Sequence, residues 1–175
     1  MTLERQEFQR LLFRTAFCLM ACDGHVDDRE VAEIRQMNKS AAFFQGIDLS
    51  TELDELLSGL KSRGKQIVDE LFETIDKLNI STVQELLILE VAFRLVHADE
   101  KVDENEIKFL RYLRSKLKVH NETIRDRFGV VEYLFDKDYS QDIIKKETHD
   151  ELFDAISIPE LSAFSTIDFA NTAST

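Results

Sequence analysis

The sequence predicts an all-α fold, a helical bundle built from two repeated helix–turn–helix units around a central buried helix. The first observation behind this prediction is composition: the 175 residues include one Pro and five Gly, and 43% are hydrophobic. So few helix breakers favour helix, and the length suits a single hydrophobic core. The second is an apolar spacing of about 3.6 residues along most of the chain. The third is an acidic motif that occurs twice.

The N-terminal half divides into helices at recognisable caps and glycines. We expect a first helix over about 4–22, with an apolar face that includes Phe8, Leu11 and Leu19, and a second over about 28–39. After a loop near 43–49, the Ser50/Thr51 region is expected to cap a leucine-rich stripe that continues to Leu78. Gly59 and Gly64 either split this stripe into two helices or, in the case of Gly64, allow close packing.

The C-terminal half begins with a strong helix-start signal. Ser81 and Gln84 form a predicted capping box for a helix over about 82–98, whose apolar run over 86–93 is typical of the central buried helix of a bundle. A helix over about 104–117 follows. Asn121 is expected to cap a further helix that ends at Phe128, because Gly129 suits a helix C-terminus. The segment 130–157 shows weaker helical periodicity.

The acidic motif runs from Cys22 to Glu30 as CDGHVDDRE and from Ala98 to Glu106 as ADEKVDENE. Equivalent residues lie 76 positions apart (99 − 23), and similarity extends to both sides, which predicts repeated units over about 8–40 and 84–117. In each copy the second Asp is expected to be a helix N-cap, with the Glu three residues later completing a capping box. The pairs are Asp27 with Glu30 and Asp103 with Glu106.

Helix capping does not account for the first Asp of each copy. Asp23 and Asp99 fall at the end of the preceding helix, where negative charge is unfavourable, so they indicate an unseen partner or cation. The first copy matches the second half of an EF-hand loop, but Leu19 and Ala21 occupy the positions of two leading carboxylates, which excludes a normal EF-hand. A weaker carboxylate site for Ca²⁺ or Mg²⁺ stays open beside the capping role. Its candidate ligands are Asp23, Asp27, Glu30, Asp99, Asp103 and Glu106.

An apolar helix that runs into A-D-G-x-V-D-x-x-E, repeated after a long helical spacer, resembles the TerB-like family. This family comprises the tellurite-resistance B proteins and a related domain of some membrane-anchored J-domain co-chaperones, and the resemblance covers roughly residues 8–130. It implies an all-helical fold without catalysis and acidic clusters that bind divalent metal. It also implies a link to tellurite or chemical-stress resistance and to membrane-associated complexes. The chain departs from the pattern at Cys22, in place of Ala, and at Glu100, in place of Gly.

Net charge and cysteine content limit the classes of partner and the cellular compartments that we expect for this protein. The net charge of −12 repels phosphate backbones, so we expect no nucleic acid and instead a protein partner with a basic surface. Glu4 and Glu7 replace the basic region of a signal peptide, and no apolar run is long enough for membrane insertion. Cys18 and Cys22 are expected to be free thiols. These features favour a cytoplasmic protein, or one peripheral to the inner face of the membrane, and leave its oligomeric state open.

Catalytic motifs are absent from the sequence, which predicts that the protein is not an enzyme. There is no Glu-x-x-His pair, no H-E-x-x-H, no P-loop and no nucleophile elbow. The alternative is a metal-dependent helical hydrolase that uses His149, Asp150 and nearby acidic residues. His97 and His120 match the pattern of metal phosphohydrolases only loosely.

The last residues differ in composition from the rest. We expect a helical domain over 1–150 and a C-terminal tail over 151–175 that contains the only Pro, Pro159. The tail is either loose or a docking strap, because its apolar residues keep a regular spacing. Those residues are Ile158, Leu161, Phe164, Ile167 and Phe169.

Overall fold

The fold is all helical, as the sequence predicts. The computed structural model describes residues 4–22, 28–40, 43–64, 66–98, 102–131 and 134, and its regular elements within them are seven helices. The helices are α1 (Arg5–Cys22), α2 (Asp28–Ser40), α3 (Leu49–Arg63), α4 (Gln66–Lys77), α5 (Thr82–Val96), α6 (Glu104–Lys116) and α7 (Asn121–Phe128). The expected helix boundaries at 4–22, 28–39, 82–98 and 104–117 therefore hold to within two residues.

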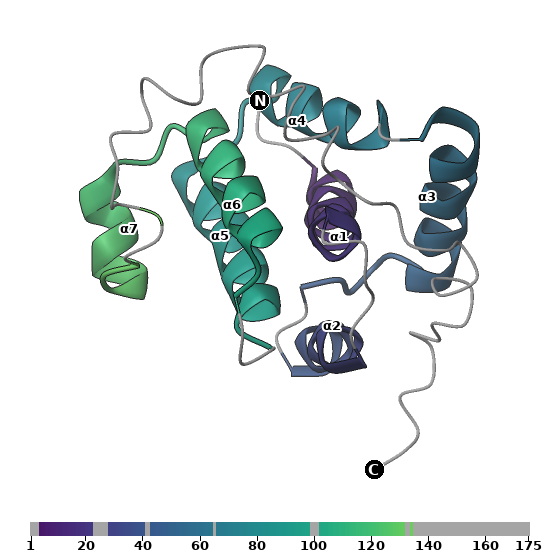
Figure 1. Cartoon of the computed structure of the whole chain (residues 1–175), viewed down its shortest axis with the longest axis horizontal. Helices are drawn as coiled ribbons and strands as arrows, with labels where there is room; N and C mark the ends of the chain where they lie inside the picture. The colour runs from purple at the N-terminus through teal and green to yellow at the C-terminus, as the bar shows by residue number, and fades with distance from the viewer. Residues whose placement is uncertain are drawn as a thin grey trace.

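Helix α1 lies at the centre of the bundle. Figure 1 shows it end-on, with α2, α3, α4 and the α5–α6 pair around it. It contacts α3, α4, α5 and α6, most extensively α5, and every residue from Thr15 to Cys22 is buried. The sequence places the central helix at 82–98 instead. Helix α5 is largely buried as well, but Leu86, Leu87 and Arg94 stay partly exposed because fewer helices cover it.

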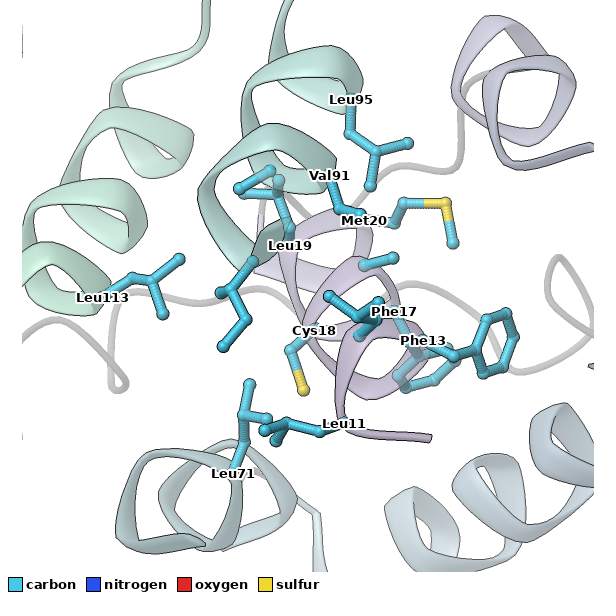
Figure 2. Packing of buried hydrophobic residues seen from close by; sticks show 14 of the residues in the cluster. Leu11, Phe13, Phe17, Cys18, Leu19, Met20, Leu71, Val91, Leu95 and Leu113 are labelled. Carbon is cyan, nitrogen blue, oxygen red and sulfur yellow. The ribbon is translucent and has the colours of Figure 1, made fainter. Parts of the chain in front are cut away.

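Aromatic side chains join distant segments in the core. Phe13, Phe44, Phe72 and Phe109 are all fully buried. The rings of Phe13 and Phe44 meet edge-on at 5.8 Å, and those of Phe72 and Phe109 are 5.3 Å apart. Figure 2 shows Phe13 and Phe17 of α1 among the aliphatic side chains of the surrounding helices. These contacts hold the 43–48 turn against α1 and α4 against α6.

The starts of α5 and α3 confirm one predicted cap and correct another. Ser81 and Gln84 form the expected capping box, in which the Gln84 N–H donates to Ser81 Oγ at 3.2 Å. The cap of α3, however, is Asp48 rather than Ser50 or Thr51. Its carboxylate accepts the backbone N–H groups of both these residues, so the helix begins earlier, at Leu49.

The predicted Asn121 cap is also wrong. The N-cap of α7 is His120, which makes no side-chain capping hydrogen bond, and Asn121 is already helical. Asn121 Oδ1 instead accepts from Arg114, at 2.6 Å from Nη2. A hydrogen bond to a charged donor on the preceding helix thus replaces the local cap. Gly129 ends the helix as expected, with φ at 79°.

Two glycines shape the junction of α3 and α4. Gly64 adopts φ of 60° and ends α3, so the leucine-rich stripe is split into two helices. Gly59 allows the close approach instead, since a Cβ there would lie 2.8 Å from Ile67 Cδ1.

The two proposed repeats occupy matching elements. Helices α2 and α6 are both 13 residues long, and they start at residues 76 positions apart, Asp28 and Glu104. Several equivalent positions are buried in both units. Examples are Phe13 and Leu89, Ala16 and Ala92, Leu19 and Leu95, Ile34 and Leu110, and Glu30 and Glu106. Superposition of the units stays a prediction, as does the division into 1–150 and 151–175, since the expected tail and nearly all of 130–157 lie outside the described residues.

Candidate functional site

The two acidic turns are the candidate site that the sequence predicts. Three of its six candidate ligands, Asp23, Asp27 and Asp99, lie outside the described residues. The other three are placed: Glu30 in the first turn of α2, Asp103 at the N-cap of α6 and Glu106 in the first turn of α6.

Asp103 and Glu106 form the predicted capping box. The Asp103 N–H donates to Glu106 Oε2 at 2.9 Å, and Asp103 Oδ1 accepts the Asn105 N–H at 2.7 Å. Glu106 is only 3% exposed, whereas Asp103 is exposed. The capping role of the second turn is therefore confirmed, and it positions one carboxylate inside the fold and one at the surface.

The first turn matches this arrangement where it is described. Helix α2 begins at Asp28, directly after the expected cap Asp27, and Glu30 is only 2% exposed. The capping box of Asp27 and Glu30 stays a prediction, because Asp27 lies outside the described residues. A glutamate buried in the first turn complements the positive end of the helix dipole in both units.

Metal-binding side chains do not form a cluster in the described part of the chain. No group of three or more His, Cys, Asp or Glu side chains is arranged there to hold a metal ion. His97 and His120 are both exposed. His25, His149 and Asp150 lie outside the described residues, so the hydrolase alternative is not tested. None of the described helices is both long and apolar enough to span a bilayer.

A cavity of about 250 Å³ between α1, α3 and α4 is a feature that the sequence prediction missed. Its lining includes Arg14, Cys18, Glu52 and Glu55. Burial raises the pKa of the Cys18 thiol to about 12, against a smaller lowering by the nearby Arg14 charge. The sequence signal that could have indicated this cavity is Arg14, because it is the one charged residue in the apolar run from Leu11 to Cys22.

Comparison with known families decides the relationship that the motif suggests. The family model described as "Tellurite resistance protein TerB" matches residues 9–127. The chain belongs to the TerB family. The TerB match begins inside α1 and ends inside α7, so it includes both acidic turns and confirms the predicted resemblance. TerB domains are generally non-catalytic, and the family is linked to tellurite resistance. No curated protein and no solved structure matches this chain significantly.

Proposed function

We propose that this TerB-family chain is a non-catalytic interaction module whose two acidic turns bind a divalent cation, Ca²⁺ or Mg²⁺, in tellurite or chemical-stress resistance. The observation that carries the proposal is the TerB match over residues 9–127, which spans both turns. Carboxylate oxygens are the ligands that these hard cations prefer. The first Asp of each turn, Asp23 and Asp99, supplies charge that helix capping does not require.

The capping geometry of the second turn supports a weak site rather than a tight one. Glu106 and Asp103 each commit one oxygen to a backbone N–H. A site with few remaining oxygens, and without the backbone ligands of an EF-hand loop, would hold Ca²⁺ or Mg²⁺ at about 10⁻⁴ M or weaker. Glu100, in place of the family glycine, makes the second turn the less favourable of the two.

Asparagine substitutions separate cation binding from helix capping. Asn caps helices about as well as Asp but carries no charge, so Asp27→Asn and Asp103→Asn remove a charged ligand and keep the cap. Calorimetry with Ca²⁺, Mg²⁺, Mn²⁺ and Zn²⁺ at millimolar concentration should give binding heat in the natural chain. We expect these variants and Asp23→Asn to weaken that heat.

Asp54→Asn is the matched control, because Asp54 is exposed in the middle of α3 and outside both turns. It should bind the cation like the natural chain. Absence of heat with all four metals would leave the turns with the capping role alone and refute the cation proposal.

The proposed mode of action is contact with a basic protein surface, beside a membrane-associated complex at the inner face of the membrane. The net charge of −12 supports it, because such a surface attracts basic partners over long range. Affinity capture of partners from a lysate at low and high ionic strength tests this mode. Capture should fall steeply as salt rises, because the Debye length shrinks from about 10 Å at 0.1 M to about 3 Å at 1 M. Capture that does not change with salt would contradict it.

A further inference from the structure

The cavity between α1, α3 and α4 has an apolar floor. Its aliphatic and sulfur-bearing lining consists of Leu11, Cys18, Leu56, Ile67 and Leu71, all of them buried. Figure 2 shows the side chains of Leu11 and Cys18 from α1 and Leu71 from α4 directed toward the same space. The volume of about 250 Å³ lies below the roughly 300–1,000 Å³ of sites for drug-sized ligands. The floor therefore suits a small aliphatic group.

Among the charged side chains of the lining, one positive and one negative group form no ion pair with the described residues. Two lining residues pair with each other, since Arg63 Nη1 lies 3.0 Å from Glu70 Oε2. A third, Glu52, pairs with Arg10 outside the lining, whose Nε lies 2.8 Å from Glu52 Oε1. Arg14 and Glu55 also line the cavity, and the described residues offer neither of them a hydrogen bond or ion pair. The cavity thus presents one uncommitted guanidinium and one uncommitted carboxylate.

Glu52 adds a buried acceptor to the cavity wall. The residue is only 5% exposed, and its Oε2 atom has no hydrogen-bond partner in the part of the chain that the structure describes. Leaving a buried carboxylate oxygen without a hydrogen-bond donor costs more free energy than leaving a buried neutral polar atom without one. A ligand that carries N–H donors would offset this cost.

We propose that this cavity binds a small zwitterion with an aliphatic side chain, an α-amino acid about the size of leucine. The carboxylate of the ligand would pair with Arg14, its ammonium group with Glu55 and Glu52, and its side chain would cover the apolar floor. A net-neutral ligand fits because the lining leaves one charge of each sign. None of the lining residues belongs to the acidic turns, so the proposal does not depend on cation binding there.

Ligand analogues test each part of this assignment on the full chain. L-leucine at about 10 mM, ten times a millimolar Kd, should raise the melting temperature and give calorimetric heat. The analogues are leucine methyl ester, which lacks the carboxylate, 4-methylpentanoate, which lacks the ammonium, and glycine, which lacks the side chain. Each should have a much smaller effect. No response to leucine, or an equal response to any analogue, would overturn the proposal.

Substitutions at the two uncommitted charges locate the binding. Arg14→Gln and Glu55→Gln should each weaken the Kd for leucine by about tenfold or more. Both residues are exposed, so folding should survive, which circular dichroism can verify. The matched controls are Arg5→Gln on α1 and Glu73→Gln on α4, both exposed and outside the cavity lining. The assignment would be overturned if the control variants bound leucine as weakly as the cavity variants do. It would also be overturned if the cavity variants bound leucine as tightly as the natural chain does.

Discussion

At the scale of single residues, Asp103 is a helix cap and also a candidate ligand of the proposed cation site. Its carboxylate accepts the Asn105 N–H, while Glu106 accepts the N–H of Asp103 itself. These hydrogen bonds satisfy backbone donors that the first turn of α6 would otherwise leave without a partner. The stability of the turn and its proposed cation binding therefore depend on the same atoms, and only substitutions that keep the cap can separate them.

Replacing Asp103 by Ala should lower the free energy of unfolding by about 1 kcal/mol, the usual size of an N-cap loss. Asp103→Asn should lower it much less, since the amide oxygen still accepts the N–H of Asn105. Urea unfolding in the absence of divalent cations measures both. An equal loss in the two variants would assign the effect to charge rather than to capping.

The buried thiol of Cys18 is expected to lower the free energy of unfolding at alkaline pH. Burial raises the pKa of its thiol from 9.0 to about 12 in the folded state, and Arg14 lowers it slightly. Between these values the folded chain holds a proton that the unfolded chain has lost, so the free energy of unfolding falls as pH rises. Below pH 9.0 the contribution of the thiol is fully present.

We expect Cys18→Ala to lose this alkaline sensitivity. Between pH 8 and pH 10, the natural chain should lose about 1.4 kcal/mol of unfolding free energy relative to the variant. Urea unfolding of both proteins at the two pH values gives this difference directly, because other titrating groups cancel. Parallel pH profiles would show that the thiol ionises equally in both states.

At the scale of elements, Gly59 sets the distance between α3 and the chain that enters α4. A Cβ at this position would lie 2.8 Å from Ile67 Cδ1 and 2.7 Å from Arg63 Nη2. Arg63 is half-exposed and has room to rotate away, but Ile67 is buried. The contact with Ile67 therefore decides the outcome of a substitution.

Gly59→Ala should destabilise the fold by about 1 kcal/mol or more, although Ala is normally the better helix former. Ser58→Ala is the matched control, because Ser58 is exposed on the same helix and should gain a few tenths of a kcal/mol. Thermal unfolding compares the two. A stabilised Gly59→Ala variant would mean that Ile67 repacks freely.

Glu85 fixes the connection between α6 and α7. This buried residue of α5 accepts the backbone N–H groups of Lys118, at 3.0 Å, and Val119, at 2.7 Å. Hydrogen bonds to a charged acceptor are among the stronger ones in proteins. Helix α5 thereby holds a segment more than 30 residues away in the chain, as the sequence separation of 33 shows.

Glu85→Ala should lower the free energy of unfolding by about 3 kcal/mol, because the N–H groups of Lys118 and of the buried Val119 both lose a charged acceptor. Glu85→Gln, which keeps one oxygen acceptor, should lose less. Glu90→Ala provides the control on the same helix, since its ion pair with Arg127 is partly exposed and worth at most about 1 kcal/mol. Similar losses at positions 85 and 90 would rule out a special role for the buried carboxylate.

At the scale of the whole molecule, the TerB match and the described helices coincide. The match ends at residue 127, one residue before the end of α7, and nearly all of the chain beyond it lies outside the described residues. The apolar spacing of Ile158, Leu161, Phe164, Ile167 and Phe169 keeps the docking-strap prediction open for that part.

Deleting residues 158–175 tests the strap. If these apolar residues dock on their own chain, the melting temperature should fall; if they dock on a partner, one captured protein should disappear while the melting temperature holds. Thermal unfolding and affinity capture of the same truncated protein distinguish the two. If both readouts match the full chain, the strap prediction is wrong.

Local signals explain why much of the fold was predictable. The Ser81–Gln84 and Asp103–Glu106 capping boxes and the Gly64 and Gly129 stops act within a few residues of chain, so composition and spacing reveal them. The failures at Ser50/Thr51 and Asn121 arose where a neighbouring side chain, Asp48, or an arginine of the preceding helix made the hydrogen bond instead. The acidic turns were predicted from their repetition, and their capping role in the second turn is confirmed.

The sequence by itself determined the helical class, most helix boundaries, the TerB relationship and the capped start of α6, because each rests on neighbours in the chain. Only the tertiary structure decided that α1 lies at the centre, that Glu85 holds the segment before α7, and that Arg14 and Glu55 meet at one cavity with no partner among the described residues. The physical reason is that periodicity reveals a buried face but not what covers it. Ion pairing between helices, such as Arg10 with Glu52, then decides which charges remain available to a ligand.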